Sequence, residues 1–443
     1  MNILMFSITP LFPKHDMGGG QKHLRSIALH LAGQGHDVTL LCTRRADTNA
    51  PFQWHERARV LPILRFRQPF PAPYDTPAYN IAAIMQDVGE HMQRADRFYI
   101  HDGEFVFPYV YRDKPTVVGL RDNVYPETIQ GAFHFEGHRL IVISDYARQF
   151  FLQTVGRFFP ELPSRIRVIR NSIDWTRFQP TAPRRILNLI PTVHPERHAI
   201  VLHPHRPEDS KGIWQTIEVA ERLVKHYGID SLRVLVPRWL GVQFDPGVQE
   251  LYARVEREIA QRGLSEHFVF HDWVQVELLP EYYSLGGVTL ALGHFVESFG
   301  NAVYESLGCG TPSIVARIST HRKLLPDSLI DKVDFGDHDT AARLAADILR
   351  GRRRTPQATL DYLHANFRLE DQLNAYAETI LSAEAAPPMH YRFSPIDDAT
   401  RFSLPVWCYH AGAKGIYHDY LVSVFAGRRN GKSAGCVSGR LHV

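Results

Sequence analysis

The sequence predicts an α/β protein built from two doubly wound domains, because strand-like and helix-like segments alternate along two separate stretches of the chain. The first alternation spans residues 2–169. The second starts at residue 199, after four prolines within residues 179–198 have interrupted the periodicity. A length of 443 residues also suits two domains of roughly 200 residues each. Ligands of such sheets bind beyond the carboxyl ends of the strands, so we expect the functional residues in the loops that follow strands.

The first stretch begins with a strand, a glycine-containing loop, a helix and a second strand. Apolar side chains recur at helical spacing over residues 24–31, and the Gly33–Gly35 segment ends that helix. Two strands joined by a helix imply a right-handed crossover in a parallel sheet. Residues 43–77 are rich in Pro, Arg and aromatic residues, and no single structure is predicted for them. The strands predicted in this stretch are Asn2–Phe6, Val38–Leu41, Arg97–Ile100, Thr116–Gly119, Leu140–Ile143 and Arg167–Ile169.

The second stretch repeats the strand–helix unit in a regular order. Its predicted strands are Ala199–His203, Leu232–Val236, Phe268–His271, Val288–Leu292 and Ser313–Ala316. Its predicted helices are Gly212–His226, Val248–Arg262, Leu278–Leu285, Asn301–Leu307, Thr340–Leu349 and Leu369–Ala383. Residues 385–443 differ in character. We interpret their clustered aromatic residues as an arm packed onto the body, and we expect the polar last ~15 residues to be disordered.

The bulk composition disfavours several classes of protein. The hydrophobic fraction of 44% and the charged fraction of 22% are those of an ordinary globular protein, and a formal charge of +3 argues against a nucleic-acid binder. Four scattered cysteines without a C-x-x-C pair indicate neither a zinc site nor a disulfide framework. The N-terminus lacks a signal-peptide pattern, and no run of 18 apolar residues occurs. We therefore expect a cytoplasmic protein whose membrane contact is at most peripheral. The basic and aromatic segment Arg65–Phe70 and the basic run Arg352–Arg354 are expected to be solvated surface, and the alternative is that they face an anionic membrane or an acidic acceptor.

Two carboxylates, Glu297 and Glu305, flank seven residues after a predicted strand. The second lies inside a predicted helix, and the first lies just before the N-terminus of that helix. Phe299, Gly300 and Asn301 would present unpaired backbone N–H groups there, which suits a phosphate. The carboxylates would accept hydrogen bonds from sugar hydroxyls. The same spacing also fits a plain helix cap and a solvated glutamate.

A second set of charged residues opens the helix predicted at Gly212–His226. Arg206 and Lys211 lie five residues apart in a loop that follows a predicted strand. Both could reach one diphosphate, Arg through a bidentate fork and Lys as a compact point charge. The alternative is a solvated loop in which Glu208 and Asp209 are the local partners of these cations.

Two further features follow strands of the first stretch. Gly18, Gly19 and Gly20 precede the first helix, and their amides could cradle an anion, although a merely flexible loop is the competing interpretation. The pattern is not G-x-G-x-x-G, so ordinary dinucleotide binding is disfavoured. His101 directly follows the strand that ends at Ile100, and a neutral imidazole there could contact a sugar hydroxyl. A lone histidine is also often a purely structural residue.

Taken in order, these features resemble the retaining glycosyltransferases of family 4, which have the two-domain GT-B fold. The resemblance spans residues 1–383. Each motif is loose by itself, but their order and spacing agree with the family. The segments that carry it are the glycine-rich loop, the helix end Leu31–Val38, His101, Ile143–Ser144, the interdomain segment Ile166–Phe178, Arg206–Gly212, Glu297–Glu305 and Gly310–Pro312.

The resemblance implies a GT-B architecture, in which two Rossmann-like doubly wound domains face each other across a cleft, here followed by a C-terminal extension. It implies an acceptor-binding domain (1–180), a nucleotide-sugar donor domain (181–368), a helix returning toward the N-terminal domain (369–384) and an extension of unknown role (385–443). The enzyme would be a metal-independent retaining glycosyltransferase of the hexosyltransferase type, with no cofactor and a nucleoside-diphosphate sugar as donor. The donor base and sugar, the acceptor (saccharide, lipid or small molecule) and the oligomeric state stay open.

The same resemblance implies a role for each candidate residue. Arg206 and Lys211 would bind the donor diphosphate and stabilise it as a leaving group, in the role that a metal has elsewhere. Glu297 would hold the donor sugar, and His101 would contact it at the catalytic face, with no protein nucleophile assigned. The other donor-binding residues would be Glu305 at the ribose, Trp273 and Val274 at the nucleobase, Phe299, Gly300 and Asn301 through their backbone, and Gly18, Gly19 and Gly20 closing over phosphate or acceptor.

The sequence departs from the family at several positions and leaves two other functions open. His205 and Ser172 stand where Gly is usual, Gly293-His294 replaces Pro-Ser, and Ser306 replaces Ala. None of these changes removes a charged group that the mechanism requires. A sugar-nucleotide epimerase or a phosphorylase could have the same fold, although no lysine in a cofactor-anchoring context favours the phosphorylase. A non-catalytic sugar-binding subunit would have been indicated by loss of a motif charge, and all of these charges remain.

Overall fold

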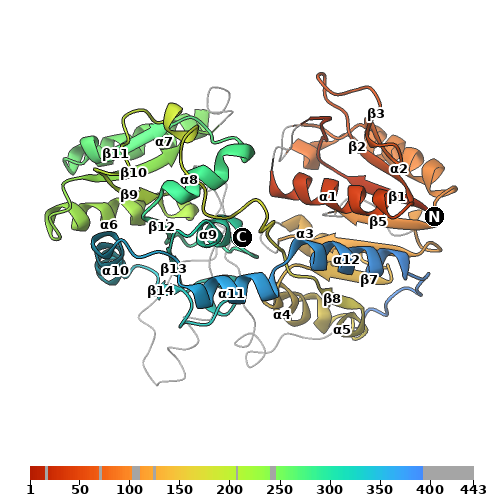
Figure 1. Cartoon of the computed structure of the whole chain (residues 1–443). Coiled ribbons are helices and arrows are strands. Elements are labelled where there is room, and N and C mark those ends of the chain that lie inside the picture. The colour runs from red at the N-terminus through yellow and green to blue at the C-terminus, as the bar shows by residue number, and fades with distance from the viewer. Residues whose placement is uncertain are drawn as a thin grey trace, which may run out of the picture. The chain divides into compact units, whose positions relative to one another are not determined.

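The computed structural model describes residues 1–14, 18–68, 72–101, 110–122, 126–205, 208–239 and 246–392. These residues form two compact units (Figure 1). Unit 1 contains the described residues up to Asn171 and those from Glu370 onward, and unit 2 contains those from Ser172 to Leu369. Among the predicted site residues, Arg206 lies outside the described residues.

Unit 1 is built on an eight-stranded sheet in the order β3-β4-β2-β1-β5-β6-β7-β8. Neighbouring strands are parallel except β3 and β4, which form an antiparallel hairpin. The order reverses between β1 and β5, which is the position at which such sheets bind ligands. The strands are β1 (Asn2–Ser7), β2 (Asp37–Thr43), β3 (Phe52–His55), β4 (Ala58–Leu64), β5 (Arg97–His101), β6 (Thr116–Leu120), β7 (Arg139–Val142) and β8 (Ile166–Val168).

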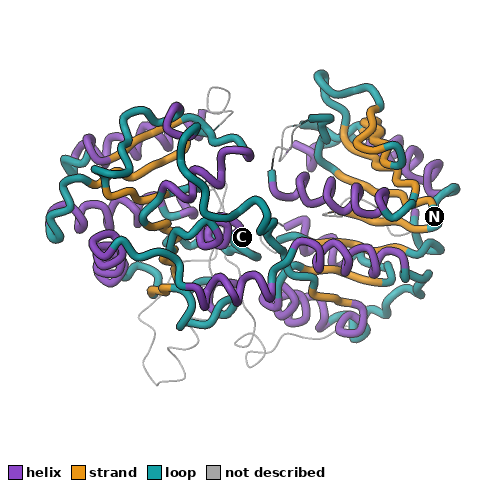
Figure 2. The backbone as a smooth tube through the Cα atoms, in the orientation of Figure 1, coloured by secondary structure: helices purple, strands orange, loops and turns teal. Residues whose placement is uncertain are grey.

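Helices cover both faces of the unit 1 sheet (Figure 2). Helices α1 and α12 share one buried core, to which α1 contributes Leu24 and Ile27 and α12 contributes Tyr376 and Ile380. The last helix of the described chain therefore completes the first unit. The helices of this unit are α1 (Gly19–Gly33), α2 (Ala78–Met92), α3 (Pro126–Phe133), α4 (Asp145–Gln153), α5 (Leu162–Arg165) and α12 (Leu369–Leu381).

The chain beyond α12 stays on unit 1 up to the last described residue. Arg165 Nη2 donates to the Pro387 carbonyl at 2.6 Å, and the Arg392 amide donates to the Phe158 carbonyl at 2.7 Å. The Tyr391 ring stacks on the Phe158 ring with 5.9 Å between centroids. The rest of the aromatic arm expected from the sequence, from residue 393 onward, lies outside the described residues.

Unit 2 is built on a six-stranded parallel sheet in the order β11-β10-β9-β12-β13-β14. This strand order is typical of nucleotide-binding Rossmann folds, and it reverses between β9 and β12. Two doubly wound units, as predicted from the sequence, are therefore confirmed. The strands are β9 (Ala199–Leu202), β10 (Leu232–Pro237), β11 (Phe268–His271), β12 (Val288–Ala291), β13 (Ser313–Ala316) and β14 (Asp331–Val333).

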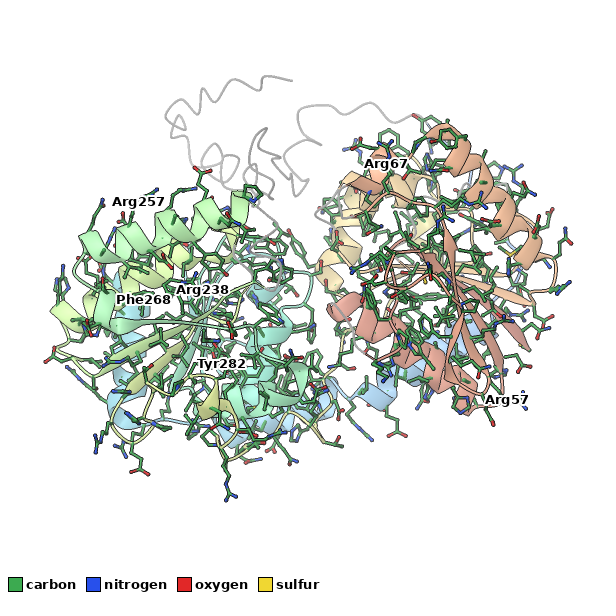
Figure 3. The ribbon with its side chains drawn as sticks, turned by 90° about the horizontal axis from the view of Figure 1, so that it is seen from above. Arg57, Arg67, Arg238, Arg257, Phe268 and Tyr282 are labelled. Atoms are coloured by element: carbon green, nitrogen blue, oxygen red, sulfur yellow. The ribbon has the colours of Figure 1, made fainter. Side chains whose placement is uncertain are left out.

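The core of unit 2 lies between its sheet and helices α6, α7 and α10, and it consists of aliphatic side chains with Phe268. Helix α9 packs on β12 and β13 and is flanked by α8 and α11. In Figure 3, Tyr282 of α8 lies inside the unit, whereas Arg257 points outward from α7. The helices are α6 (Ile213–Lys225), α7 (Pro246–Gln261), α8 (Leu279–Leu285), α9 (Asn301–Gly308), α10 (His338–Gly351) and α11 (Gln357–Asn366).

The predicted elements agree with the observed ones to within two residues at each end. The main difference is the segment 43–77, for which the sequence predicted no single structure and which contains the hairpin β3–β4. Val60 and Leu64 of β4 are buried, and Trp54 Nε1 of β3 donates to the Phe12 carbonyl at 2.9 Å. The frequent Pro and Arg residues had obscured these buried side chains. Helices α2, α3, α4, α5 and α11 and strand β14 also had no predicted range.

Within the described part of the chain, no helix combines the length and the apolar character needed to cross a membrane.

Candidate functional site

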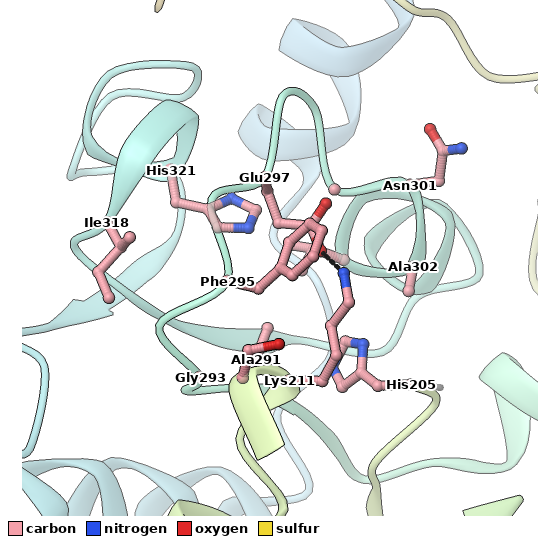
Figure 4. A pocket seen from close by; sticks show the side chains of 13 residues that line it. His205, Lys211, Ala291, Gly293, Phe295, Glu297, Asn301, Ala302, Ile318 and His321 are labelled. Atoms are coloured by element: carbon pink, nitrogen blue, oxygen red, sulfur yellow. Dashed lines mark hydrogen bonds and ion pairs between the residues drawn. The ribbon is translucent and has the colours of Figure 1, made fainter. Parts of the chain in front are cut away.

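A pocket lies in unit 2 at the point where the strand order of its sheet reverses. Its walls come from the loops that follow β9, β12 and β13, and it holds about 440 Å³ of empty space, part of it open to solvent. The position is the one at which doubly wound sheets bind ligands. The polar and aromatic side chains that line it include His205, Lys211, Phe295, Glu297, Asn301 and His321 (Figure 4).

The loops after β9 and β12 touch through glycine backbones. Gly212 has a φ of +92°, and a β-carbon on it would lie 2.4 Å from the Gly293 nitrogen. A β-carbon on Gly293 would lie 2.1 Å from the Ser210 carbonyl oxygen. Glycine is therefore required at both positions, because any side chain would force the two loops apart. This close approach brings Lys211 next to Glu297.

Lys211 is held inside the pocket by two partners. Its Nζ lies 2.6 Å from Glu297 Oε1 and 3.1 Å from the centroid of the Phe295 ring. The side chain of Lys211 is 10% exposed and that of Glu297 is 26% exposed, so solvent screens the pair only in part. Figure 4 shows the ammonium group beside the Glu297 carboxylate and the Phe295 ring, with the ion pair drawn as a dashed line. The geometry thus fixes a cation at the ligand edge of the sheet.

Glu297 is an ionised carboxylate in this environment. Burial raises its pKa, but the charge of Lys211 and the hydrogen bond from it outweigh burial, so the pKa lies below its usual value. The carboxylate can therefore accept hydrogen bonds at neutral pH, and among the described residues it accepts one from Lys211.

Two histidines of the pocket are neutral. Burial lowers the pKa of His205 to about 4, and the nearby Lys211 charge adds to this effect. Burial also lowers the pKa of His321 to about 4, although the Glu297 carboxylate opposes the shift. His205 Nε2 lies 2.9 Å from the Leu290 carbonyl, which can only accept, so Nε2 carries the proton.

The N-terminus of α9 opens at the same pocket. Gly300 precedes it with a φ of +92°, and the structure gives the N–H groups of Asn301 and Ala302 no hydrogen-bond partner among the described residues. Such amides carry partial positive charge and favour an anion. The Asn301 side chain points away from Lys211 in Figure 4, so this residue can serve the pocket through its backbone.

The remaining predicted residues of this motif lie outside the pocket wall. Phe299 is buried, and its ring packs against Tyr304 and Phe367 at 5.0 and 5.6 Å. Glu305 lies a turn further along α9, and the Tyr283 hydroxyl hydrogen-bonds its carboxylate. The two motif carboxylates therefore occupy separate places, Glu297 beside the Lys211 ammonium and Glu305 beside a buried tyrosine.

The predicted nucleobase residues lie two strands away from β9 in the same sheet. Trp273 and Val274 follow β11, and a second tryptophan, Trp239, follows β10. The Trp239 and Trp273 rings meet edge to face with 5.0 Å between centroids, and Val274 is buried. Strands are spaced by about 4.8 Å, so Trp239 follows the strand next to β9 and Trp273 follows the strand about 10 Å from β9. Neither tryptophan belongs to the pocket wall around Lys211.

The predicted residues of unit 1 lie at the reversal point of its own sheet. His101 ends β5, Gly19 and Gly20 open α1, and Gly18 precedes them in an exposed, extended conformation. His101 Nε2 lies 3.1 Å from the Gly20 carbonyl, and Nδ1 lies 3.0 Å from the Tyr99 hydroxyl. Burial holds the pKa of His101 well below its usual value. The imidazole is therefore neutral, and both of its nitrogens contact the protein.

Sequence reasoning missed several residues that the structure places at these two positions. Arg121 follows β6 and contacts His23 Nδ1, and its Nη2 donates to Asn171 Oδ1 at 3.2 Å. In unit 2, Phe295 lies under the Lys211 ammonium, and His321 follows β13. Arg121 and His321 both lie in loops after predicted strands, so the rule that ligands bind in the loops following strands could have identified them.

Comparison with known proteins gives consistent matches. The family described as "Glycosyl transferases group 1" matches residues 189–357, and "Glycosyltransferase Family 4" matches residues 17–177. A D-inositol 3-phosphate glycosyltransferase of Geodermatophilus obscurus is 30% identical over 190 residues, which are 41% of this chain and 40% of that protein. The match thus spans about two fifths of this curated relative.

Solved structures with the same fold cover most of the chain. HepE of Anabaena, in complex with UDP and glucose, is 19% identical with a TM-score of 0.67, and the match covers 86% of this chain and 100% of that one. Sucrose-phosphate synthase of Thermosynechococcus elongatus is 17% identical with a TM-score of 0.66, covering 85% and 97% of the two chains. At these identities the likeness establishes the GT-B fold.

Proposed function

Because the chain belongs to the group 1 glycosyltransferases, we propose that it transfers a sugar from a nucleoside-diphosphate donor to an acceptor, with retention of anomeric configuration and without a metal. The two family matches account for most of unit 1 and unit 2, so the proposal draws on both. HepE, one of the structural neighbours, binds UDP and glucose, which agrees with a hexose nucleotide as donor.

The observation that carries the proposal is the position of Lys211. Its ammonium lies in the pocket at the reversal point of a Rossmann-like sheet, and the amides of Asn301 and Ala302 open at the same pocket. A cation and a helix N-terminus around one cavity suit a diphosphate. When the bond between sugar and diphosphate breaks, negative charge grows on the departing oxygen, and preorganised positive groups stabilise it. Arg206, from the same loop, is proposed as a second cation.

The other residues of unit 2 are assigned around this diphosphate. Glu297 leaves Lys211 when the diphosphate arrives and then accepts hydrogen bonds from the hydroxyls of the donor sugar. Glu305, held by the Tyr283 hydroxyl, binds the ribose. Trp273 and Val274, about two strand spacings along the sheet from β9, lie where a nucleobase would extend. Retention is proposed from the resemblance to family 4, and no protein nucleophile is assigned.

Unit 1 is proposed to bind the acceptor. His101 at the end of β5 and the α1 glycines lie at the carboxyl edge of its sheet, where a ligand is expected. The neutral imidazole of His101 would contact the donor sugar after its hydrogen bond to the Gly20 carbonyl is exchanged for one to substrate.

The test has two steps. The purified chain is screened for thermal stabilisation by UDP, GDP, ADP and dTDP and by their sugars, because a ligand that binds the folded state raises its apparent stability. The stabilising donor is then incubated with candidate acceptors in the presence and absence of EDTA. We expect transfer that EDTA does not abolish. Turnover of the donor without any acceptor would instead indicate an epimerase, and stabilisation by no nucleotide would contradict the donor site.

A further inference from the structure

His321 reaches the pocket through a strained turn. Ser319, three residues after β13, has a φ of +45°, a conformation that side-chain-bearing residues rarely adopt. It is 2% exposed, and its hydroxyl has no hydrogen-bond partner among the described residues. Backbone strain and an unsatisfied buried hydroxyl both cost stability, and such features persist where the surrounding structure enforces a geometry. Here the turn delivers the His321 ring to the pocket.

The hydrogen bond on one side of the ring fixes its tautomer. His321 Nδ1 lies 2.9 Å from the Tyr304 hydroxyl, and Tyr304 is 1% exposed. No other partner of that hydroxyl occurs among the described residues, so a proton on Nδ1 would leave the buried tyrosine proton without an acceptor. The Tyr304 hydroxyl therefore donates to Nδ1. As a consequence the proton of the neutral imidazole lies on Nε2.

The protonated side of the ring faces the start of α9. A β-carbon on Gly300 would lie 2.5 Å from His321 Cε1 and 2.9 Å from Nε2, whereas Nδ1 would be 3.7 Å away. Nε2 has no hydrogen-bond partner among the described residues. The Nε2–H group thus opens at the place where the Asn301 and Ala302 amides are also unpaired. His321, Asn301 and Ala302 thus contribute three N–H donors to the lining of this pocket.

His205 provides an internal contrast. It lines the same pocket and is also neutral, but its N–H group is used by the Leu290 carbonyl at 2.9 Å. His205 can therefore only accept a hydrogen bond through Nδ1, whereas His321 can donate one. An anionic ligand requires donors, so of the two histidines His321 has the chemistry that fits.

We propose that His321 is a donor-binding residue, whose Nε2–H group hydrogen-bonds the diphosphate of the sugar nucleotide together with the α9 amides. This inference rests on the proposed function and adds to it an uncharged side chain that hydrogen-bonds the diphosphate. Lys211 supplies a positive charge next to the diphosphate. His321 supplies a hydrogen bond of fixed direction, because its ring is held by the Tyr304 hydroxyl and by the Ser319 turn.

The test compares binding to full-length variants at position 321. UDP is titrated calorimetrically, with GDP, ADP and dTDP in parallel, and the matching nucleoside without phosphates serves as the control ligand. Gln places an N–H donor near the position of Nε2, whereas Asn places it near that of Nδ1. We expect His321→Ala and His321→Asn to weaken the diphosphate about tenfold or more, as for a lost hydrogen bond to a charged group. His321→Gln should recover most of the affinity, and nucleoside binding should be unchanged in all variants.

A purely structural role would give a different pattern. Tyr304→Phe removes the same hydrogen bond within the protein and keeps the imidazole, so equal losses of unfolding temperature and of affinity in Tyr304→Phe and His321→Ala, without rescue by Gln, would overturn the inference. Normal diphosphate affinity in His321→Ala would also overturn it. The wild type and Lys211→Ala are titrated alongside. Failure of the wild type to bind any of these nucleotides, or normal diphosphate affinity in Lys211→Ala, would count separately as failure of the proposed function.

Discussion

Lys211 and Glu297 form a 2.6 Å ion pair although 86 residues separate them in the sequence. The pair exists because two glycines, Gly212 and Gly293, let the loops after β9 and β12 approach more closely than any side chain would allow. It places opposite charges at the reversal point of the unit 2 sheet, where a ligand is expected. Each group is the partner of the other, and in the proposed function a diphosphate binds Lys211 and releases Glu297 to bind the sugar.

Removing the ammonium should impair catalysis far more than folding. Lys211→Ala should lower kcat/KM by roughly 10²–10³, because a charge-assisted contact to the departing diphosphate contributes about 2–4 kcal/mol to the transition state. Lys211→Arg should retain part of the activity, since the charge stays while its position changes. Steady-state kinetics and thermal unfolding of both variants check this. Near-normal kcat/KM in Lys211→Ala would remove Lys211 from the site.

The close approach of the two loops gives a second prediction. Gly293→Ala places a β-carbon 2.1 Å from the Ser210 carbonyl oxygen, so the loops must separate and the Lys211–Glu297 pair must open. We expect a loss of several kcal/mol in stability and a loss of donor affinity. Gly89→Ala is the matched control, because position 89 lies in helix α2 with open space around it and alanine favours a helix by about 1 kcal/mol. Unaltered donor binding by Gly293→Ala would contradict the role given to the loop contact.

The strained turn at Ser319 predicts a substitution that stabilises the protein. Ser319→Gly removes an unsatisfied buried hydroxyl and relieves a φ of +45°, both of which cost free energy in the native state. Part of this gain is offset because glycine has greater freedom in the unfolded chain. We expect a net stabilisation of about 0.5–1 kcal/mol in urea unfolding. A destabilised Ser319→Gly protein would show that the hydroxyl has an important partner.

The neutral pocket histidines make stability depend on pH. Burial lowers the pKa of His205 and of His321 to about 4, below the value of 6.5 of the unfolded chain. Between pH 6.5 and pH 4 the unfolded state therefore binds more protons, so this contribution to stability is complete above pH 6.5 and is lost as the pH falls toward 4. Urea unfolding across this range should show a weaker pH dependence for His321→Gln than for the wild type. Equal slopes would mean that the pKa of His321 is the same in the folded and unfolded protein.

Much of this arrangement follows from local sequence signals. The alternation of strands and helices predicted both sheets, and the rule that ligands bind after strands pointed to Lys211 and Glu297 from the sequence alone. What local signals could not supply is contact between distant segments. The need for glycine at position 293, the Phe295 ring under the ammonium and the Tyr304 hydroxyl on His321 depend on how separate loops pack.

The hairpin β3–β4 was missed for a related reason. Its buried residues Val60 and Leu64 lie among Arg59, Pro62 and Arg65, so the segment has the composition of a loop. The placement of β3 at the edge of the sheet, with β4 between β3 and β2, is a property of the folded unit. Trp54, which holds the loop after β1 through the Phe12 carbonyl, could be assigned this role only from the structure.

The most direct test of the account is a crystal structure of the full chain with the nucleoside diphosphate that stabilises it. We predict that Lys211 Nζ exchanges Glu297 for a phosphate oxygen within hydrogen-bonding distance, and that the Asn301 and Ala302 amides point at the same diphosphate. A bound nucleotide whose phosphates lie away from Lys211, with the Lys211–Glu297 pair still closed, would contradict it.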